Sequence, residues 1–388
     1  MTFRRGIITT VAAGILLVIT GIAFSKANPQ YIFSSLYING IFWTGVSLFG
    51  SFFIALNYAS GAAWIVPFFR ILEGMGAFLP LPLAIIALII LLNILNISHI
   101  FHWMDNNIAA KDPLIRWKSP YLNIPFFIIR WLIISLIWVG FTRWLQRINK
   151  SYHQTNSIEN YYRGRKVSAL YLLLIVITAP VAAWDWLLSI DVHWFSTIFG
   201  WYVFASWWIS GLAIFALLAL SPQPAHHLLT KEHLHNISKW MFAVALVWCY
   251  AFYFQFMLIW YAHLPEEITY FQIRLKEYPL LFWGIFAINF FIPFFLLMDR
   301  DAKRNPAIVR IVAIALIAGH WLNTYLSVVP SVFIDKATPS LLILSAGFFA
   351  LFLSLFLWRC GEYLKKTYPE IHYHPLLEEA LHYKSDAR

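Results

Sequence analysis

The 388-residue chain is 61% hydrophobic, 19% aromatic and only 12% charged, and its mean hydropathy is +0.68. A soluble domain carries roughly 25% charged residues, so this composition excludes a soluble enzyme and indicates a polytopic membrane protein. Two cysteines, Cys249 and Cys360, are too few for a disulfide framework, an iron–sulfur cluster or a zinc site made of thiolates alone.

The apolar stretches predict the membrane spans. A bilayer core about 30 Å thick needs about 20 apolar residues in a helix. Stretches this long and continuous lack the alternation of a membrane β-barrel, so we expect an all-α polytopic membrane protein with about ten transmembrane helices. The predicted spans are residues 7–24, 38–58, 79–99, 125–145, 168–188, 198–220, 240–262, 279–298, 309–329 and 340–358. They form a single transmembrane domain, 1–358, followed by a tail, 359–388.

The positive charges predict the orientation. An even number of spans puts both termini on one side, and 20 of the 28 Lys and Arg residues lie nearer to the loops of that side. By the positive-inside rule both termini are cytoplasmic. This asymmetry accounts for the net charge of +10, so no nucleic-acid partner is expected.

Arg70 and Glu73 stand three residues apart in AWIVPFFRILEGMGAFLPLP, between prolines that break helices. We expect a re-entrant or surface helix with an internal ion pair. A role in proton entry is the alternative.

Polar residues follow the third predicted span and begin the fourth. Asn96, His99 and His102 succeed one another at three-residue steps, which would place them on one helix face near the outer side. Arg130, in the next span, is a natural counter-ion for Asp185 or for a ligand oxygen. Its alternative role is snorkelling to the lipid headgroups.

The fifth predicted span ends in AWDWLLSIDVHWFST, which contains Asp185, Ser189 and His193 at four-residue steps, with Asp191 beside them. If the helix extends that far, these side chains line one face near the outer surface. A carboxylate and an imidazole at this spacing can accept the protons that a bound hydroquinone releases. The alternative is an interfacial role, because tryptophans and polar residues are common at the ends of membrane helices.

His320 lies near the middle of the ninth predicted span, where an ionisable side chain is costly and therefore suggests function. Asn323, Thr324 and Ser327 share its helix face and, with Gln255 of the seventh span, could form a proton path. A histidine that only holds neighbouring helices together is an equal alternative. A transporter with a midplane site at His320 is a further one.

One central histidine, His320, cannot supply the two axial ligands of a bis-histidine haem. Two cysteines are also too few to hold an iron–sulfur cluster. Any electron chemistry must therefore use a carrier that dissolves in hydrocarbon and must pass the electrons to another subunit. A quinone is such a carrier, and its headgroup needs polar side chains within an apolar slot.

Four segments carry a family resemblance: WDWLLSIDVHWFSTIFGWYVFASWW, KDPLIRWKSPYLNIPFFIIR, AWIVPFFRILEGMGAFLP and GHWLNTYLSVVP. Together they resemble the NrfD/PsrC-like integral membrane subunits, and among these the ActF group, the second quinone-binding subunit of alternative complex III. The resemblance covers about residues 35–358. It implies two four-helix bundles, spans 2 to 5 and 6 to 9, flanked by spans 1 and 10.

The resemblance implies a bacterial inner-membrane subunit of a respiratory quinol:electron-acceptor oxidoreductase, which is not an enzyme alone. Quinol, with menaquinone favoured, would be the substrate, while haem c and iron–sulfur clusters would belong to partner subunits only. The expected partners are a paralogous NrfD-like subunit, an iron–sulfur subunit, cytochrome c subunits and a terminal oxidase. A non-catalytic scaffold subunit of that complex is the alternative.

The motifs match the family position by position. The candidate quinone-binding residues are His99, His102, Arg130, Asp185, Asp191 and His193, of which Asp185, His193 and His99 would accept protons. The candidate proton path comprises His320, Asn323, Thr324, Ser327 and Gln255, and no metal site is expected. The family often has an aspartate at the position of Asn323. An amide cannot bind and release a proton at physiological pH, so this substitution weakens the case for a full proton path.

Overall fold

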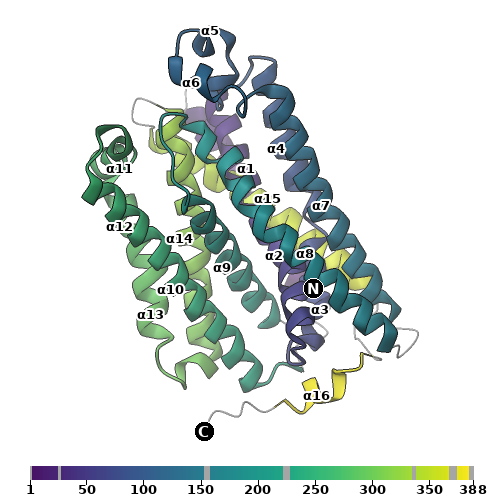
Figure 1. The fold of residues 1–388 in the computed structure, drawn as a ribbon. Coiled ribbons are helices and arrows are strands. Elements are labelled where there is room, and N and C mark those ends of the chain that lie inside the picture. The colour runs from purple at the N-terminus through teal and green to yellow at the C-terminus, as the bar shows by residue number, and fades with distance from the viewer. Residues whose placement is uncertain are drawn as a thin grey trace.

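The computed structural model describes residues 2–24, 28–152, 158–221, 228–333, 338–366 and 374–383. Within these ranges the chain forms helices and no strand, and ten helical spans are long and apolar enough to cross a membrane (Figure 1). The chain is therefore an all-α, multi-pass membrane protein, as its composition predicts.

The spans run up and down between two ends of one bundle (Figure 1). They are α1 (Thr2–Phe24), α2 (Pro29–Ser60), α3 with α4 (Phe69–Gly76 and Pro80–Ile94), α7 (Ile124–Ser151), α8 (Ile158–Trp186), α9 (Phe199–Ala219), α10 (Lys231–Ala262), α12 with α13 (Pro279–Phe286 and Ile292–Leu296), α14 (Pro306–Val332) and α15 (Pro339–Lys366). One end carries the short helices α5 (Asn106–Ala109), α6 (Pro113–Lys118) and α11 (Pro265–Glu277), and is named the α6 end. The opposite end carries α16 (Leu377–Leu381) and is named the α16 end.

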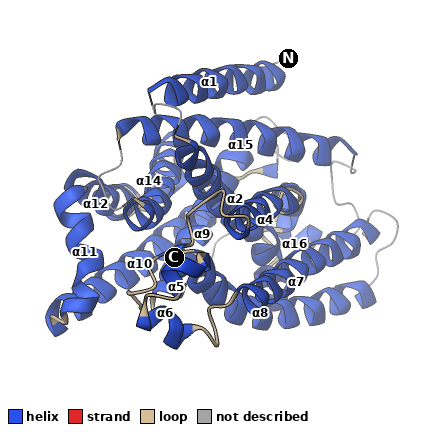
Figure 2. Cartoon of the chain, turned by 90° about the horizontal axis from the view of Figure 1, so that it is seen from above, coloured by secondary structure: helices blue, strands red, loops and turns tan. Residues whose placement is uncertain are grey.

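Helix α2 forms the centre of the bundle. Its most apolar stretch is 100% buried, and it packs against α3, α4, α8, α9, α14 and α15 (Figure 2). Glycines permit this close approach. A Cβ atom on Gly45 would lie 2.2 Å from the Trp207 ring, and one on Gly50 would lie 2.2 Å from the Leu72 carbonyl oxygen. A helix that is apolar on all sides belongs in the core, and small residues let neighbouring backbones reach it.

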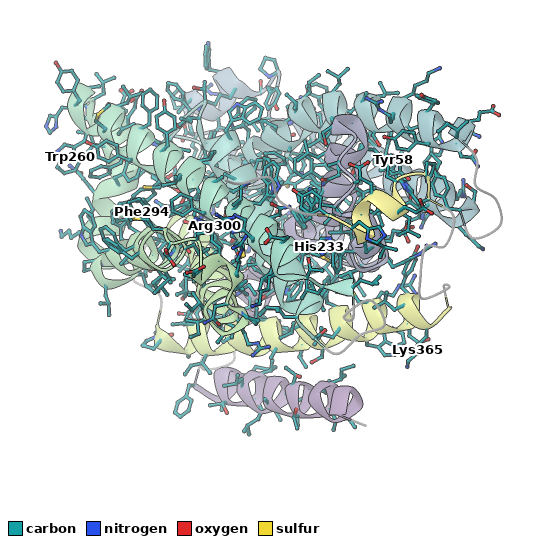
Figure 3. All side chains as sticks on the ribbon, turned by 90° about the horizontal axis from the view of Figure 1, so that it is seen from below. Tyr58, His233, Trp260, Phe294, Arg300 and Lys365 are labelled. Carbon is teal, nitrogen blue, oxygen red and sulfur yellow. The ribbon has the colours of Figure 1, made fainter. Side chains whose placement is uncertain are left out.

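For description, the helices inside the flanking pair are taken as two groups that share extensive contacts. Helices α2, α4, α7 and α8 pack as one group, and α9, α10, α12–α13 and α14 pack as a second group, joined to the first mainly through α2, α8 and α9. The flanking helices are α15, which packs on α2 and α3, and α1, which packs on α15 (Figure 3). Gly21 and Gly347 bring α1 and α15 together, since a Cβ atom on Gly21 would lie 2.7 Å from Leu344.

Several helix ends differ from the predicted spans. Helix α2 begins at Pro29 rather than at residue 38, because the Asn28 side chain accepts a hydrogen bond from the Gln30 amide at 3.0 Å and caps the helix. Helix α4 ends at Ile94, and Asn96 has a φ of 57°. The predicted helical face of Asn96, His99 and His102 is therefore wrong, because a left-handed residue ends the helix before the histidines.

The eighth span is interrupted. A π-helical segment, Ala287–Phe291, separates α12 from α13 and places Asn289 in the core. Gly319 of α14 makes room for it, because a Cβ atom there would lie 2.0 Å from Asn289 Oδ1. π-Helical turns inside α-helices are frequent at functional sites, and this one adds a polar side chain to the second group of helices.

Arg70 and Glu73 form the predicted ion pair, with 2.6 Å between Arg70 Nη1 and Glu73 Oε2. The prediction of a surface helix is wrong: α3 is buried, and both residues are only 1% exposed. The Tyr363 hydroxyl also donates to Glu73 Oε2 at 3.0 Å, and Gln146 donates to the Glu73 carbonyl oxygen at 2.9 Å. The pair is thus part of a buried polar network at the α16 end.

The described part of the tail lies against the α16 end of the bundle. The His374 ring is 4% exposed and sits among Tyr58, Phe69, Tyr152 and Tyr161, at centroid distances of 4.8 to 5.9 Å. Helix α16 follows and packs beside the 3-10 turn Val66–Phe68. Aromatic packing of this kind anchors the tail to α2, α7 and α8.

Tail docking should weaken in acid. Burial lowers the pKa of His374 to about 4, whereas a free histidine has a pKa of about 6.5. The docked tail thus requires neutral imidazole, and its stability is complete above about pH 6.5 and declines as the pH falls towards 4. Hydrogen exchange of the α16 amides, corrected for the intrinsic rate, should lose on the order of 10-fold protection between pH 7.5 and pH 5. A His374→Phe variant keeps an aromatic ring and should abolish the dependence; equal protection of the wild type at both pH values would contradict this account.

Candidate functional site

A cavity of about 390 Å³ lies at the α6 end, between the segment around α6 and the segment that follows α8. It is named the α6 cavity, and its lining is mostly aromatic and aliphatic. The lining residues are Trp117, Lys118, Pro120, Tyr121, Leu122, Trp184, Leu188, Ser189, Asp191, Val192, Trp194 and Phe195. Small-molecule sites commonly have volumes of about 300–1,000 Å³ and combine an apolar wall with a few polar groups. The α6 cavity has both properties.

Local structure explains why these two segments form the wall. Helix α8 ends at Trp186 and continues only as a 3-10 turn, Leu188–Ile190, so the following residues leave the helix direction. The segment across the cavity is held by Asp112, whose carboxylate caps α6 by accepting a hydrogen bond from the Leu114 amide at 2.8 Å.

Trp184 and Trp194 contribute aromatic surface to the wall of the α6 cavity. Trp194 is held in place by Tyr270, whose ring stacks on it at a centroid distance of 3.7 Å. Both indole N–H groups are buried and lack a hydrogen-bond partner among the described residues. The same is true of Trp43, Trp103, Trp131, Trp186, Trp208 and Trp248, so this property does not by itself mark a ligand site.

Arg130 and Asp185 form a bidentate ion pair directly behind the cavity wall. Arg130 Nε lies 2.6 Å from Asp185 Oδ2, and Arg130 Nη2 lies 3.0 Å from Asp185 Oδ1. The predicted pairing is confirmed. Neither residue lines the cavity, because the Tyr121 ring covers the guanidinium, with 3.8 Å from Arg130 Cζ to the ring centroid. Tyr121 therefore separates this charge pair from any ligand in the cavity.

Lys118 and Asp191 are the charged residues of the wall itself. The Lys118 ammonium donates to the Val192 carbonyl oxygen at 2.5 Å, which ties the α6 segment to the other side of the cavity. Burial lowers the pKa of Lys118, and the nearby carboxylates of Asp191 and Asp112 oppose this shift. Asp191 is thus the one carboxylate that the described chain presents to the cavity.

His193 lies outside this site. Its predicted alignment with Asp185 and Ser189 on a helix is wrong, because α8 ends before Ser189. The His193 side chain is 62% exposed and contacts Asp112, with 2.8 Å between Nε2 and Oδ2. Ser189 instead donates its hydroxyl to the carbonyl oxygen of Asp185.

His99 and His102 do not line the cavity either. His99 is exposed, and its backbone amide donates to Gln30 at 3.2 Å. His102 is half-buried in a 3-10 turn that starts after Phe101, and burial, assisted by His99, lowers its pKa. The carboxylates of Asp105 and Asp191 oppose this shift of the His102 pKa.

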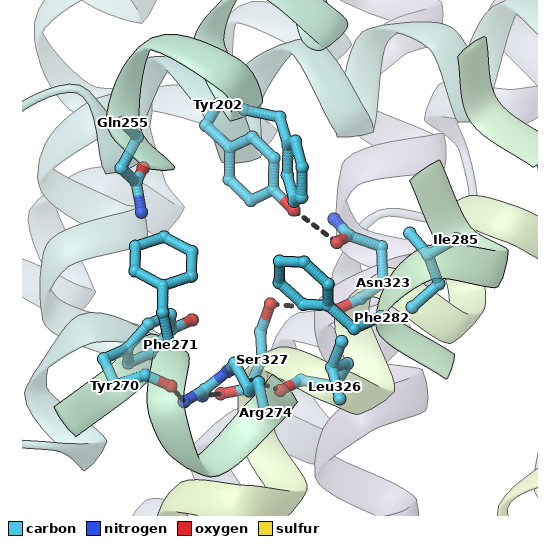
Figure 4. A pocket seen from close by; sticks show the side chains of 11 residues that line it. Tyr202, Gln255, Tyr270, Phe271, Arg274, Phe282, Ile285, Asn323, Leu326 and Ser327 are labelled. Atoms are coloured by element: carbon cyan, nitrogen blue, oxygen red, sulfur yellow. Dashed lines mark hydrogen bonds between the residues drawn. The ribbon is translucent and has the colours of Figure 1, made fainter. Parts of the chain in front are cut away.

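A second, much smaller cavity lies among α9, α10, α11, α12 and α14 (Figure 4). It is named the α11 cavity, and its volume of about 20 Å³ is enough for about one water molecule. Gln255, Asn323 and Ser327 of the predicted proton path are all in its wall. The Tyr202 hydroxyl donates to Asn323 Oδ1, while Gln255 Oε1 has no partner among the described residues.

Arg274 is the cation of the α11 cavity, and sequence reasoning missed it. Its guanidinium donates to the carbonyl oxygens of Tyr270, Leu326 and Ser327 at 2.9, 3.2 and 3.3 Å and to Ser331 Oγ at 3.1 Å. It is 3% exposed and has no carboxylate within ion-pair distance among the described residues. In the sequence, Arg274 stands in a charged segment between two predicted spans. Such a segment looks like a solvated loop, so nothing there indicates that Arg274 is buried.

His320 is fully buried, as its position predicts, and its Nδ1 lies 2.9 Å from Ser206 Oγ. Its Nε2 has no partner among the described residues, and the same is true of both polar atoms of the Asn289 side chain. Thr324 and Ser327 share the predicted helix face, but their hydroxyls donate to carbonyl oxygens of their own helix at 3.1 and 2.9 Å. Because these hydroxyls donate within α14, they contribute less to a continuous hydrogen-bonded proton path than their spacing suggested.

The described residues contain no group of three or more His, Cys, Asp or Glu side chains that could hold a metal ion. A comparison of the sequence with models of protein families finds no match, and neither does a comparison with curated proteins. The fold and the cavities define an all-α multi-pass membrane protein with a ligand-sized cavity at one membrane face.

The Arg130–Asp185 pair should dominate the stability of the cavity wall. Arg130→Gln leaves a carboxylate buried without its counter-ion, which typically costs about 3–5 kcal/mol. The variant should therefore unfold at a clearly lower temperature in detergent. The double variant Arg130→Gln, Asp185→Asn removes the stranded charge and should regain most of the loss. Exposed Arg310→Gln is the control, and a loss of the same size in that control would contradict a special role for the pair.

Proposed function

We propose that the protein is an integral membrane subunit of a respiratory quinol:electron-acceptor oxidoreductase and that it binds the quinol headgroup in the α6 cavity. The observation that carries the proposal is a ligand-sized, aromatic cavity at the α6 end with one carboxylate in its wall. The motifs that resemble the NrfD/PsrC-like subunits support it, because the most specific of them contains Trp184, Asp191 and Trp194.

The chemistry of the headgroup matches this wall. Oxidation of a quinol releases two protons and two electrons, so its site needs a proton acceptor and groups that orient the ring oxygens. Asp191 is the proton acceptor, and the aromatic side chains of the wall, Trp184 and Trp194 among them, enclose the quinol ring. The buried Arg130–Asp185 pair holds Tyr121 against the site. The electrons pass to iron–sulfur and haem c partner subunits, because this chain offers thiolates only at Cys249 and Cys360.

The orientation follows from the charges. Most of the Lys and Arg residues lie towards the α16 end, so that end faces the cytoplasm of a bacterial inner membrane. The α6 cavity then opens on the outer side, where protons released from quinol leave directly and where iron–sulfur and cytochrome c subunits dock. A paralogous membrane subunit and a terminal oxidase complete the proposed assembly.

Proton conduction through the second group of helices is a second candidate function. It is favoured by the buried polar atoms that lack partners among the described residues: Gln255 Oε1, His320 Nε2 and the side-chain amide of Asn289. Buried polar groups without protein partners commonly bind water, and ordered waters can complete a hydrogen-bonded chain. Arg274 lies at the α6 end of this series and is hydrogen-bonded to the carbonyl oxygen of Ser327.

The quinol site is tested by Asp191→Asn in the complex purified from its native membrane. Removal of the proton acceptor should lower quinol turnover about 100-fold, a typical contribution of a general base, while assembly is retained. Asp299→Asn, at an exposed position near the α16 end, is the control. Unchanged turnover in Asp191→Asn would discard the quinol site, and isolation of the chain without haem and iron–sulfur partners would discard the assembly.

The proton path is tested by His320→Leu in reconstituted vesicles. The ratio of protons translocated to electrons transferred should fall, while quinol turnover continues, because His320 is far from the α6 cavity wall. Ser354→Ala removes another buried hydroxyl, on α15, and should leave the ratio unchanged. An unaltered ratio in His320→Leu would assign the residue to helix packing.

A further inference from the structure

Helix α7 carries a groove on the surface that faces away from the bundle. Figure 2 shows α7 and α8 at the periphery, and the groove has a volume of about 490 Å³. Its wall is one stripe of α7: Leu136, Ile137, Gly140, Phe141, Trp144 and Arg147. A Cβ atom on Gly140 would meet nothing within 4 Å. The backbone at Gly140 therefore forms the floor of the groove, because no side chain covers it there. The stripe is exposed at Leu136, which is 70% accessible.

The groove changes from apolar to charged along its length. From Leu136 to Arg147 the helix rises roughly 16 Å, close to the length of an extended acyl chain. Trp144 stands near the charged end, where tryptophans normally mark the membrane interface. Its ring packs on Phe141 at a centroid distance of 5.7 Å, which makes a flat apolar wall next to Arg147.

Arg147 belongs to a dense cluster of cations at the α16 end of α7 and α8. Residues 143–166 contain six Lys or Arg side chains and one acid, Glu159. The six are Arg143, Arg147, Lys150, Arg163, Arg165 and Lys166. All six are exposed, and no ion pair of theirs occurs within the parts of the chain that the structure describes. Helices α7 and α8 pack side by side, so these charges share one membrane face.

We propose that this groove binds an anionic phospholipid, with an acyl chain over Gly140 and the phosphate against Arg147. The charge pattern selects this occupant. Clusters of several cations at the end of a membrane helix attract anionic headgroups, each contributing about 1 kcal/mol. A zwitterionic lipid would place its own cation among the six. A transmembrane helix of a partner would fill the groove but would leave the cationic cluster without its counter-charge. The proposal does not rest on the proposed respiratory function.

Lipid binding to the full-length chain can be measured by native mass spectrometry. The detergent-purified protein is titrated with palmitoyl-oleoyl phosphatidylglycerol and, separately, with palmitoyl-oleoyl phosphatidylcholine. We expect the wild type to prefer phosphatidylglycerol at least about 5-fold. Arg147→Gln should weaken phosphatidylglycerol binding about 5-fold and remove most of the preference. Gly140→Leu fills the groove and should weaken binding of both lipids about 10-fold.

Two control variants match these changes elsewhere on the membrane surface. Gly284→Leu also adds a side chain where a Cβ atom would meet nothing within 4 Å, and Arg310→Gln removes an exposed arginine near the α16 end. Both should retain wild-type lipid binding. Equal binding of the two lipids by the wild type, or lipid binding by Gly140→Leu equal to that of Gly284→Leu, would overturn the proposal. Loss of a partner subunit from the native assembly in Gly140→Leu, with lipid binding intact, would assign the groove to that subunit instead.

Discussion

Hydrocarbon offers no hydrogen bonds, and this constraint governs the whole structure. Each backbone group within a span must find its partner in its own helix, so the chain forms long helices and admits breaks only inside the bundle. The π-helical turn around Asn289 is enclosed by α10 and α14, and the left-handed Asn96 lies just beyond the end of α4. Buried polar side chains obey the same constraint, as the bidentate Arg130–Asp185 pair and the network around Glu73 show.

The described chain also contains exceptions to this rule, and they are spread over many of its helices. Indole N–H groups at Trp184 and Trp194 lack partners beside a cavity of ligand size. Within the second group of helices, His320 Nε2, Gln255 Oε1 and both polar atoms of the Asn289 side chain lack partners among the described residues. An unpartnered polar group in a low-dielectric interior is unfavourable unless water or a ligand satisfies it.

Residue size is the second organising factor. Glycines at positions 45 and 50 of α2 admit Trp207 and the backbone of α3, while those of α1 and α15 allow two flanking helices to meet. In a membrane such contacts replace the hydrophobic effect, because lipid tails are as apolar as the side chains. At Gly140 the same absence of a side chain has the opposite result, since no helix fills the space and a groove remains open to lipid.

The sequence alone determined the class, the approximate spans and several of the important polar residues, because apolar length and charge asymmetry are local properties of a chain. It also predicted the Arg70–Glu73 and Arg130–Asp185 pairs, since an ionised group in hydrocarbon requires an opposite charge nearby. Only the tertiary structure decided which residues share a site. Helical spacing put His193, His99 and His102 on continuous faces, whereas α8 and α4 end before them. Arg274 gained its significance from the contact of α11 with α14, and Trp194 from its stacking on Tyr270 of α11; such contacts between distant segments leave no periodic trace in the sequence.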